Sequence, residues 1–521
     1  MNRKTTKRGV AFRCDAGDLI GGGHAMRCLT LANALAEDGA TITFVAASMP
    51  DLLAHRIEGC GHRLVRIPDS PELRRPAGNW EEPPLSDDAQ LADARATGAA
   101  VSQADWLVVD HYLLDVRWHS AARDFADQIL VIDDLANRSY DCDILLDQTF
   151  GRAVADYPDR VPQGAKVLAG SAYALLRPEF AREREAALER RETIGPVRRI
   201  LVSLGTTDPG GIAAGIAEQV VEASPNCAVD VVLGAQAQSL ERVSDLAGRH
   251  PGVSVHVASG QMADLIRDAD LAVGAAGTSS WERCCLGLPS IALVMADNQR
   301  KVAEGLEAAG AAIAVNRVCD IPPALSRLCN DPALLGRMSA AAFAIVDGQG
   351  TNRTCDFMLG RTSQKRGELA LRAAQPDDSR NVWLWRNDFS TRGFSQTAEP
   401  ISWQDHQGWW QASFGSTERD MMVAEIGGSP VAALRFDRIS EGFEVSINLA
   451  PSARSSGLGA HILAEACKLF RKDHGAMPLL ATIHRDNPAS RRIFEKLGFV
   501  CTGALSNSAF DRYVLRGGSA E

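Results

Sequence analysis

Short apolar runs alternate with longer helical patterns from residue 10 to about residue 320. Continuous apolar strands of this kind suit a parallel sheet that helices cover on both faces. The alternation therefore predicts an α/β fold with two doubly wound, Rossmann-like lobes. We place these lobes at residues 1–193 and 194–360, with the charged helical stretch 181–192 at their junction. The strand-like runs lie near residue 10 and at 41–46, 106–110, 129–133, 199–205, 229–234, 253–257, 271–277 and 290–295.

The pattern changes after residues 361–380, a polar and charged stretch that we predict to be a linker. Beyond it, the runs 429–437 and 443–450 follow each other closely, as in an antiparallel hairpin. A glycine loop, a helix, a strand at 478–484 and a final helix come next. We therefore predict a separate, smaller α+β domain over residues 381–521.

Composition excludes several classes of function. The formal net charge is −10, so the chain lacks the basic field that binding to nucleic-acid phosphates requires. No apolar run approaches the roughly 18 to 20 residues that span a bilayer, and we expect no membrane partner. The 12 cysteines show no paired metal-ligand spacing, which predicts reduced thiols in a cytoplasmic protein and no metal site.

Polar clusters fall directly after the predicted strands. In open α/β sheets, ligands bind beyond the carboxyl ends of the strands, where helix N-termini converge. Each cluster alone is weak evidence, but their shared placement at one edge predicts a ligand cleft there. The clusters are Gly21–His24, Asp110–Tyr112, Asp133–Asp134, Gly205–Asp208, Gly274–Glu282 and Asp297–Gln299.

The first of these loops, Gly21-Gly22-Gly23-His24, precedes a helix. It does not complete the dinucleotide fingerprint, because Met26 occupies the third glycine position, and it lacks the P-loop lysine. One interpretation is a plain strand-to-helix turn in which glycine adopts positive φ. The other is catalytic: at a helix N-terminus the macrodipole disfavours the imidazolium, so His24 would be a neutral general base.

The later glycine loops offer backbone N–H groups and hydroxyls without acid or base chemistry, which suits a diphosphate. Their candidate ligands are Gly205, Thr206, Gly277, Thr278 and Ser279. Glu282, one turn into the following helix, could accept hydrogen bonds from ribose hydroxyls. An ordinary helix-start glutamate, favoured by the dipole, explains that residue equally well.

Taken in order, several motifs resemble one enzyme family: RCDAGDLIGGGHAMRCLTLANAL, VVDHY, IDD, YDCDILLDQ, GSAYALLRPEF and SLGTTDP, followed by the Gly/Ser loop before Glu282. The chain is similar over about residues 9–345 to the UDP-2,4-diacetamido-2,4,6-trideoxy-β-L-altropyranose hydrolases of pseudaminic acid biosynthesis. The resemblance implies the GT-B architecture, with the nucleotide held mainly by the second lobe and water in place of a sugar acceptor. It implies no metal.

The same resemblance implies roles for individual residues. His24 would activate or position the water that attacks the anomeric carbon, with Tyr112 beside it. Arg13 and Asp15 would shape the sugar pocket, and Asp15 could orient His24. Gly22 and Gly23 would let sugar and water approach, while Asn298 and Gln299 would touch the sugar or the diphosphate.

The C-terminal domain carries a second resemblance. Arg454–Ala460 fits the pattern [RQ]-x-x-G-x-[GA], and His484–Ser490 with IFEKLGFV follows at the spacing of GNAT acetyltransferases. The resemblance implies acetyl-CoA as cosubstrate, with direct attack by an amine. The residues it assigns to the cofactor are Arg454, Gly457, Gly459, Ala460 and Asn487.

One position departs from the GNAT pattern. Phe494 stands where many members carry the tyrosine that protonates the departing thiolate. Tyr513 or solvent could substitute, or the domain could be impaired. Glu444 and Glu425 are candidates for the base only because they fall on predicted strands.

Together these readings predict an enzyme that N-acetylates a UDP-4-amino sugar and then hydrolyses the product to UDP and the free diacetamido sugar. UDP-linked amino sugars and acetyl-CoA are thus the expected partners. Two alternatives stay open. One is a GT-B glycosyltransferase, in which UDP release would require an acceptor. The other is a degenerate C-terminal domain that only senses acetyl-CoA.

Overall fold

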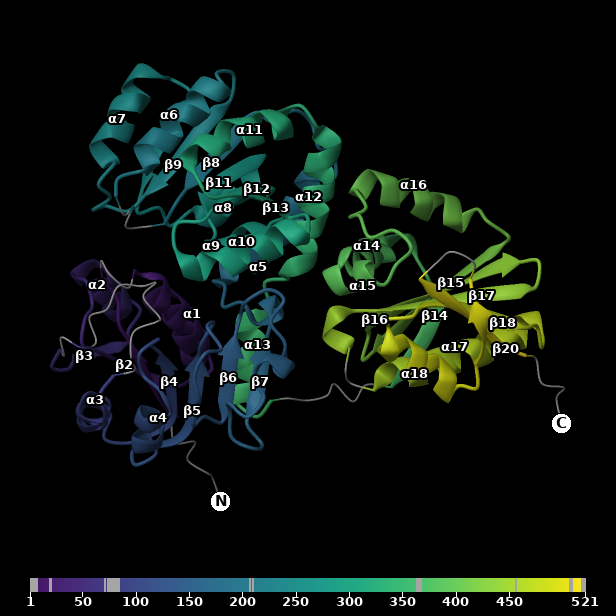
Figure 1. The fold of residues 1–521 in the computed structure, drawn as a ribbon, viewed down its shortest axis with the longest axis horizontal. Coiled ribbons are helices and arrows are strands. Elements are labelled where there is room, and N and C mark those ends of the chain that lie inside the picture. Colours follow the sequence, from purple (N-terminus) through teal and green to yellow (C-terminus); the bar gives the residue numbers. More distant parts are fainter. Residues whose placement is uncertain are drawn as a thin grey trace. The chain divides into compact units, whose positions relative to one another are not determined.

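The computed structural model describes residues 8–17, 21–69, 72, 85–205, 208, 210–361, 368–454, 457–505 and 509–516. Contacts divide the chain into two compact units (Figure 1). The first comprises Met1–Leu335 with Ile345–Thr362, and the second comprises Gly336–Ala344 with Ser363–Glu521. Among the described residues, no helix combines the length and the apolar character needed to cross a bilayer.

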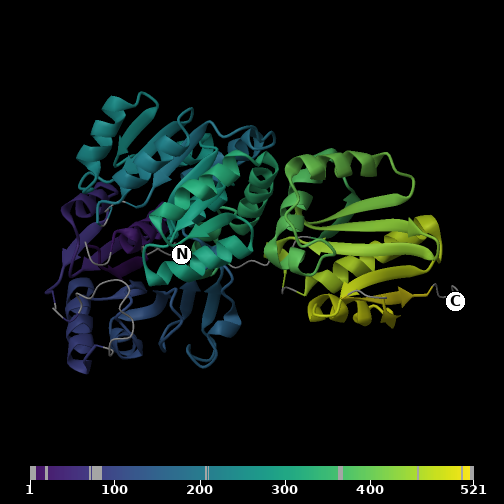
Figure 2. The same ribbon diagram turned by 45° about the horizontal axis from the view of Figure 1, so that its top comes forward.

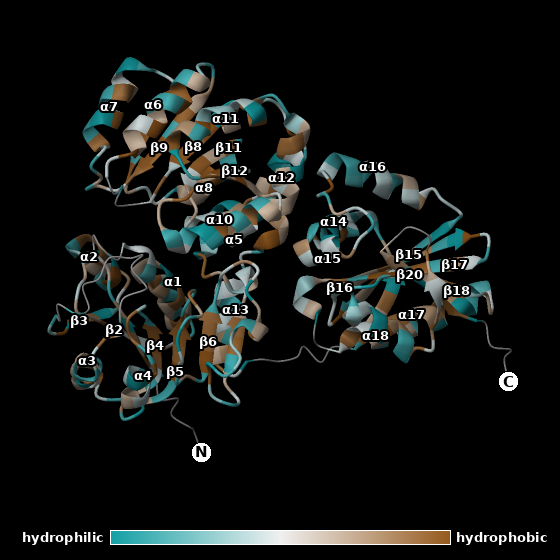
Figure 3. Cartoon of the chain, viewed as in Figure 1, coloured by the Kyte–Doolittle hydropathy of each residue, from teal (hydrophilic) through white to brown (hydrophobic). Residues whose placement is uncertain are grey.

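The first lobe of the first unit is a parallel sheet in the order β3-β2-β1-β4-β5-β6-β7. The central strands are buried on both faces. On β4, Val108 belongs to one hydrophobic core, while its neighbours Leu107 and Val109 belong to the core on the opposite face. Figure 3 shows β4, β5 and β6 as strongly hydrophobic. The strands are β1 (Gly9–Cys14), β2 (Thr41–Ala46), β3 (Arg63–Arg66), β4 (Ala104–Asp110), β5 (Ala126–Ile132), β6 (Ile144–Asp147) and β7 (Lys166–Ala169), and the helices α1 (Gly23–Glu37), α2 (Asp51–Gly59), α3 (Asp87–Val101) and α4 (Val116–Ala122).

The second lobe repeats the design with a parallel sheet in the order β10-β9-β8-β11-β12-β13. The predicted α/β fold with two Rossmann-like lobes is therefore confirmed. The strands are β8 (Arg199–Ser203), β9 (Ala228–Leu233), β10 (Val253–Val257), β11 (Leu271–Ala275), β12 (Ser290–Leu293) and β13 (Ala312–Val315). The helices are α5 (Pro178–Arg190), α6 (Ala213–Ala223), α7 (Leu240–Arg249), α8 (Met262–Asp268), α9 (Ser279–Cys285), α10 (Asp297–Ala308) and α11 (Ile321–Cys329). Helix α12 (Pro332–Ile345) follows, and its residues Gly336–Ala344 belong to the second unit.

Helix α13 (Gly350–Met358) returns to the first lobe and packs against α1. Its Cys355 and Met358 are buried in the core that β1 and α1 share. At Gly350 an added Cβ would lie 2.3 Å from the carbonyl oxygen of Ala174, so the two segments cross too closely for any larger residue. The observed lobe division thus differs from the predicted 194–360, because helical periodicity does not reveal which sheet a helix covers.

The second unit is a seven-stranded, mostly antiparallel sheet in the order β14-β15-β16-β17-β18-β20-β19. The predicted hairpin is β16 (Ser429–Ile439) with β17 (Gly442–Leu449), paired antiparallel throughout. Figure 2 shows this sheet between two layers of helices. The other strands are β14 (Leu369–Ala373), β15 (Arg419–Ile426), β18 (Leu479–His484), β19 (Val500–Ala504) and β20 (Phe510–Leu515), and the helices α14 (Ser379–Asn387), α15 (Phe389–Gly393), α16 (Trp403–Phe414), α17 (Leu458–His474) and α18 (Pro488–Lys496).

The predicted linker at 361–380 is corrected by β14. Residues 369–373 pair with β15 along their whole length, so the domain begins earlier than residue 381. The strand has the short sequence LALRA. Because polar residues flank it, composition alone does not predict a strand here.

Candidate active sites

The N-terminus of α1 carries the glycine loop. Gly21 has φ of +80°, a left-handed conformation that favours glycine, and Gly22 caps the helix without a side chain. His24 is the second residue of the helix, buried, and follows directly on the turn. The loop is therefore a strand-to-helix turn that uses a glycine with positive φ. It also places His24, the candidate base, at the start of the helix.

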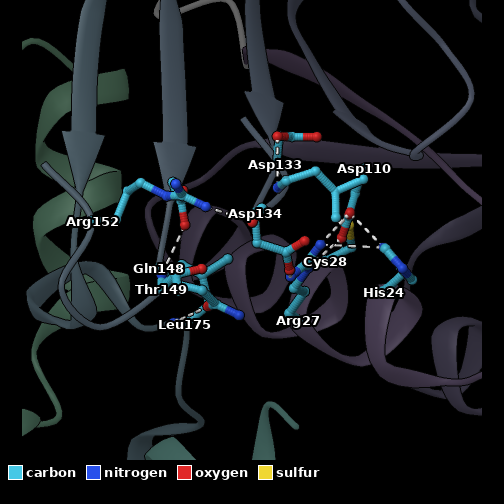
Figure 4. Close-up of polar contacts among 12 residues, drawn as sticks. His24, Arg27, Cys28, Asp110, Asp133, Asp134, Gln148, Thr149, Arg152 and Leu175 are labelled. Atoms are coloured by element: carbon cyan, nitrogen blue, oxygen red, sulfur yellow. Dashed lines mark hydrogen bonds and ion pairs between the residues drawn. The ribbon is translucent and has the colours of Figure 1, made fainter. Parts of the chain in front are cut away.

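Asp110, the last residue of β4, holds His24 from the neighbouring strand (Figure 4). His24 Nδ1 lies 2.6 Å from Asp110 Oδ1. Arg27, three residues along α1 and so on the same helix face, donates from Nε to Asp110 Oδ2 and from Nη2 to Oδ1, each at 2.6 Å. The three side chains form one buried cluster beneath the glycine loop.

The cluster determines which nitrogen of the His24 imidazole carries the proton and which carries the lone pair. Burial would raise the pKa of Asp110, but the Arg27 guanidinium and His24 hold it well below its usual range. An ionised carboxylate only accepts hydrogen bonds, so the 2.6 Å contact places a proton on His24 Nδ1. The lone pair of the neutral ring then lies on Nε2, where it can accept a proton.

Asp110 is the residue that the sequence-based prediction missed in this role. Asp15 was the expected partner of His24, but its Oδ1 accepts from the backbone of Ala47 (2.8 Å) and Ser48 (3.1 Å). Its other neighbours are Arg13 and His111. The correction has a simple cause, since Asp110 ends the strand adjacent to β1 and the strand order is not visible in the sequence.

Arg13 does not line a sugar pocket. It is fully buried, and its guanidinium is divided between Asp93, with a shortest contact of 2.7 Å, and Asp15 at 2.8 Å. We therefore correct its role to a structural one: it fixes the end of β1 against α3.

Tyr112 lies beside His24 as expected. The two rings meet edge to face with centroids 4.6 Å apart. Burial, together with the neighbouring Asp134 carboxylate, raises the pKa of Tyr112 well above its usual value. The phenol therefore remains protonated and is hydrogen-bonded to the Asp134 carboxylate, and it cannot act as a base near neutral pH.

The Gly/Ser loop after β11 faces this turn from the second lobe. A Cβ added at Gly23 would lie 3.5 Å from Thr278 Oγ1. Gln299 lies on the same side, since its Nε2 would be 3.7 Å from a Cβ at Gly277, while its Oε1 accepts from Met295 N. The glycine turn of the first lobe and the Gly/Ser loop of the second thus lie against each other. The side chain of Asn298, the other predicted residue of α10, is outside the described set.

Arg283 holds the backbone of that loop. It is buried and donates to the carbonyl oxygen of Ala275 (2.8 Å) and to the hydroxyls of Ser279 (3.2 Å) and Ser280 (3.0 Å). A Cβ at Gly274 would lie 2.6 Å from Arg283 Nη1, so only glycine lets the guanidinium reach the loop. The loop is thereby fixed before any ligand binds.

The other predicted ligands of the second lobe differ in how they are held. Gly205 follows β8 with φ of +108°, and buried Asp208 accepts from Ala213 N and Ser239 N; Thr206 is outside the described residues. Glu282 Oε1 is 3.2 Å from Arg177 Nη2, at the start of α5. Burial raises the pKa of Glu282 despite this partner. The carboxylate thus joins α9 to the start of α5 through an ion pair, and its contact with ribose stays a prediction.

In the second unit, β17 and β18 are parallel neighbours that separate almost at once. They pair only at Phe443 with Leu479 and at Glu444 with Leu480. Beyond these pairs the backbone groups of both strands turn toward a gap. Gly457 has φ of +78° at the start of α17, and a Cβ at Gly459 would lie 2.8 Å from Ile493 Cδ1, so α17 and α18 pack closely beside this opening. Ala460 continues α17.

Two predicted cofactor ligands are committed to other contacts. Arg454 binds Asp388 (2.5 Å), Ser390 and Thr391 of the α14–α15 corner. The Oδ1 of Asn487 caps α18 by accepting from Ser490 N at 2.9 Å. The arginine thus braces the domain and the asparagine caps a helix, and their contacts with the cofactor stay predictions.

Phe494 is a core residue. Its ring is buried, packs edge to face on Phe499 with centroids 5.0 Å apart, and belongs to the same hydrophobic cluster as Tyr513. The pKa of Tyr513 is raised by its surroundings, with burial as the main cause. Phe494 offers no hydroxyl for a departing thiolate, and the raised pKa keeps the Tyr513 phenol protonated.

A cavity of about 510 Å³ lies on the face of β15–β17 opposite α17, beneath α14, α15 and α16. Glu444 lines it and accepts a hydrogen bond from Thr482 Oγ1. Glu425 is not among the lining residues; it pairs instead with Arg372 at 2.8 Å. Of the two candidate bases, only Glu444 lies where β17 and β18 begin to separate. Among the described residues, no group of three or more His, Cys, Asp or Glu side chains is arranged to hold a metal ion.

Comparison with known proteins decides the family of this unit. The Acetyltransferase (GNAT) domain family matches residues 368–500. The Bacillus subtilis protein named "Putative phosphinothricin acetyltransferase YwnH" is 30% identical over 150 residues, which cover 27% of this chain and 90% of YwnH. The chain belongs to the GNAT acetyltransferase family. This membership confirms the predicted GNAT domain and supports acetyl-CoA as its cosubstrate.

Two further relatives concern more of the chain. Protein MJ1062 of Methanocaldococcus jannaschii is 21% identical over 510 residues, covering 94% of this chain and 96% of its own. The UDP-2,4-diacetamido-2,4,6-trideoxy-beta-L-altropyranose hydrolase of Campylobacter jejuni is 23% identical over 205 residues, 39% of this chain and 71% of that protein. The chain thus joins a unit with two Rossmann-like lobes, similar over part of its length to this UDP-sugar hydrolase, to a GNAT domain.

Proposed function

We propose that the chain is a bifunctional enzyme that N-acetylates a UDP-linked 4-amino sugar and then releases UDP from the product by hydrolysis. The acceptor would be UDP-4-amino-4,6-dideoxy-N-acetyl-β-L-altrosamine, and the final sugar the free 2,4-diacetamido compound of pseudaminic acid biosynthesis. The similarity to the Campylobacter hydrolase and the GNAT membership support this pairing.

The His24–Asp110 contact of 2.6 Å carries the hydrolase half of the proposal. His24 Nε2 would take a proton from water as the water oxygen bonds to the anomeric carbon. The bond from that carbon to the diphosphate oxygen breaks, and UDP leaves with the electron pair. Asp110 would stabilise the imidazolium that forms, and Arg27 keeps Asp110 ionised and correctly oriented.

UDP is an anionic leaving group, so the second lobe needs donors more than an acid. The backbone of Gly277, Thr278 and Ser279, held in place by Arg283, would supply them. Glu282 would accept from the ribose hydroxyls in exchange for its present partner Arg177. Tyr112, held protonated, would donate to the sugar or to the attacking water in exchange for its present partner Asp134.

For the acetyltransferase half, the gap between β17 and β18 would hold the extended arm of acetyl-CoA, with backbone groups of both strands as partners. The acceptor nitrogen attacks the acetyl carbonyl carbon, the carbon–sulfur bond breaks, and the thiolate of CoA leaves. Glu444 would take the proton that the acceptor nitrogen loses, directly or through water. The thiolate would take its proton from solvent, because Phe494 provides none.

The discriminating experiment follows UDP release from UDP-2,4-diacetamido-2,4,6-trideoxy-β-L-altropyranose without any added acceptor. Release by the wild-type chain, lost in His24→Ala, supports a hydrolase. Release only on addition of an acceptor sugar would favour the glycosyltransferase.

A further inference from the structure

Charged side chains of both signs line the cavity of the GNAT domain. Two guanidinium groups line it, from Arg386 at the end of α14 and Arg435 on β16. The lining carboxylates are Glu444, bonded to Thr482, and Asp405, which is exposed at the start of α16 and bonded to Ser402. The two guanidinium groups therefore share the lining with one partly buried carboxylate, Glu444, and one exposed carboxylate, Asp405.

Arg386 has no carboxylate partner among the described residues. Its Nη2 donates to the carbonyl oxygen of Thr397 at 2.8 Å, while its Nη1 is buried without a hydrogen-bond partner in that same set. A buried guanidinium nitrogen left unpaired is costly and is normally satisfied by an acceptor. Burial, with Arg392 and Arg435 nearby, lowers the pKa of Arg386, which means that the surrounding groups do not compensate its charge.

Arg435 is only partly neutralised. Its Nε lies 2.6 Å from Asp437 Oδ2, but Arg419 shares that carboxylate through a 2.5 Å contact with Oδ1. Both arginines also lie over the ring of Trp409, with distances of 5.4 Å for Arg419 and 5.8 Å for Arg435. One carboxylate thus serves two guanidinium groups, so this wall carries excess positive charge.

The register of β16 and β17 fixes how this wall relates to Glu444. Asp437 is directly opposite Glu444, and Arg435 is opposite Ser446. Arg435 and Glu444 are therefore diagonal neighbours on one face of the sheet, about 7 Å apart at the backbone. An acceptor could place an anionic group on the arginines while its amine lies at Glu444, about one sugar ring away.

We infer that the acceptor of the acetyltransferase domain is anchored by a phosphate or diphosphate group on Arg386 and Arg435. This inference rests on the proposed acetyl transfer and adds the residues that select the acceptor. Guanidinium groups bind phosphate oxygens through paired, charge-assisted hydrogen bonds, and such an anion would satisfy the buried Nη1 of Arg386. A polycationic amine would instead meet Arg386, which has no carboxylate partner among the described residues, and Arg435, which is only partly neutralised.

The test measures steady-state acetyl transfer in the full chain carrying His24→Ala, so that the product is not consumed. Acceptors are the UDP-4-amino sugar and the same amino sugar without its nucleotide. Arg386→Gln and Arg435→Gln are compared with Arg438→Gln, an exposed arginine on the same strand that does not line the cavity. The KM for acetyl-CoA reports whether each variant keeps its fold.

We expect each cavity variant to raise the KM for the UDP-linked acceptor about 10- to 100-fold, as removal of a charge-assisted contact does. The KM for acetyl-CoA and the activity on the nucleotide-free sugar should stay within about twofold of the His24→Ala parent. Inorganic pyrophosphate should compete with the UDP-linked acceptor in the parent and lose that effect in Arg386→Gln.

An unchanged KM for the UDP-linked acceptor in both cavity variants would overturn the anchor while leaving acetyl transfer intact. Equal KM values for the two acceptors in the parent protein would overturn it as well. Absence of transfer to every amine tested would instead refute the proposed acetyltransferase activity, so the two failures are distinguishable.

Discussion

His24 on α1 and Asp110 at the end of β4 are joined by a 2.6 Å contact between Nδ1 and Oδ1, although 86 residues separate them in the chain. The contact fixes the orientation and tautomer of the imidazole. Arg27 stabilises the carboxylate from the same helix as His24. A glycine turn, the proposed base and its positioning residue are thus assembled from two adjacent strand ends.

Asp110→Asn should reduce kcat for UDP release by about 10³-fold, because an amide does not stabilise the imidazolium and can favour the wrong tautomer. The KM for the UDP-sugar should change by less than about threefold, since Asp110 contacts His24 rather than substrate. Initial-rate kinetics check both values. A large rise in KM with kcat preserved would assign Asp110 to the fold of the cleft instead.

Gly274→Ala should weaken UDP binding and destabilise the second lobe by about 1–3 kcal/mol through overpacking. The new Cβ would meet Arg283 Nη1 at 2.6 Å and the carbonyl oxygen of Ser203 at 2.8 Å, so the guanidinium that holds the loop must move. Titration calorimetry with UDP measures the effect. Gly248→Ala, which meets nothing within 4 Å, is the matched control and should bind UDP normally.

Phe494→Tyr should not accelerate acetyl transfer, although it restores the residue that many GNAT members carry. The ring is buried against Phe499, so the added hydroxyl would enter the core and cost about 1–3 kcal/mol if it finds no partner. Thermal unfolding and single-turnover transfer rates measure the two effects. A rate increase above about tenfold would show that the hydroxyl reaches the reacting thiolate.

The buried side chain of His119 should make the free energy of unfolding depend on pH. It is fully buried beside Trp118 and Tyr140, and burial lowers its pKa from 6.5 to about 3. Below pH 6.5 the unfolded chain binds a proton that the folded chain does not, so stability is complete above that pH and declines as pH falls toward 3. At pH 5 the loss from this residue is about 2 kcal/mol.

His119→Phe should remove this loss, because a phenyl ring fits among aromatic neighbours and does not titrate. Urea unfolding of the first unit at pH 7 and pH 5, followed by pulse proteolysis, measures the difference. His55→Gln, at an exposed position on α2, should retain the wild-type pH dependence. Equal pH dependence in His119→Phe and wild type would contradict the assignment.

The sequence predicted the long, apolar strands well and the short strands poorly. Runs such as 106–110 are continuous and β-branched, whereas β3 is four residues with an arginine at each end. The same limit explains β14, whose pattern is surrounded by charge. Helix α13 was assigned to the wrong lobe because the contact that decides it, with α1, joins residues more than 300 apart.

Site residues on local motifs were easier to predict than their partners. His24 contacts Tyr112, and Thr278 lies against Gly23, because the strand ends gather at one edge; their roles in catalysis and binding stay predictions. Asp110 lies in the quoted segment VVDHY, but only the adjacency of β1 and β4 reveals that it, and not Asp15, orients His24. Likewise, no pattern in the sequence foretells that Arg454 binds Asp388.

The most direct test of the proposed function is mass spectrometry of the products formed from the UDP-4-amino sugar and acetyl-CoA. The wild-type chain should yield free diacetamido sugar and UDP, while His24→Ala should stop at the N-acetylated UDP-sugar. Glu444→Gln should leave the amine largely unacetylated but still hydrolyse added diacetamido UDP-sugar. Persistence of the acetylated UDP-sugar with folded wild-type protein, or release of UDP by His24→Ala at the wild-type rate, would contradict the account.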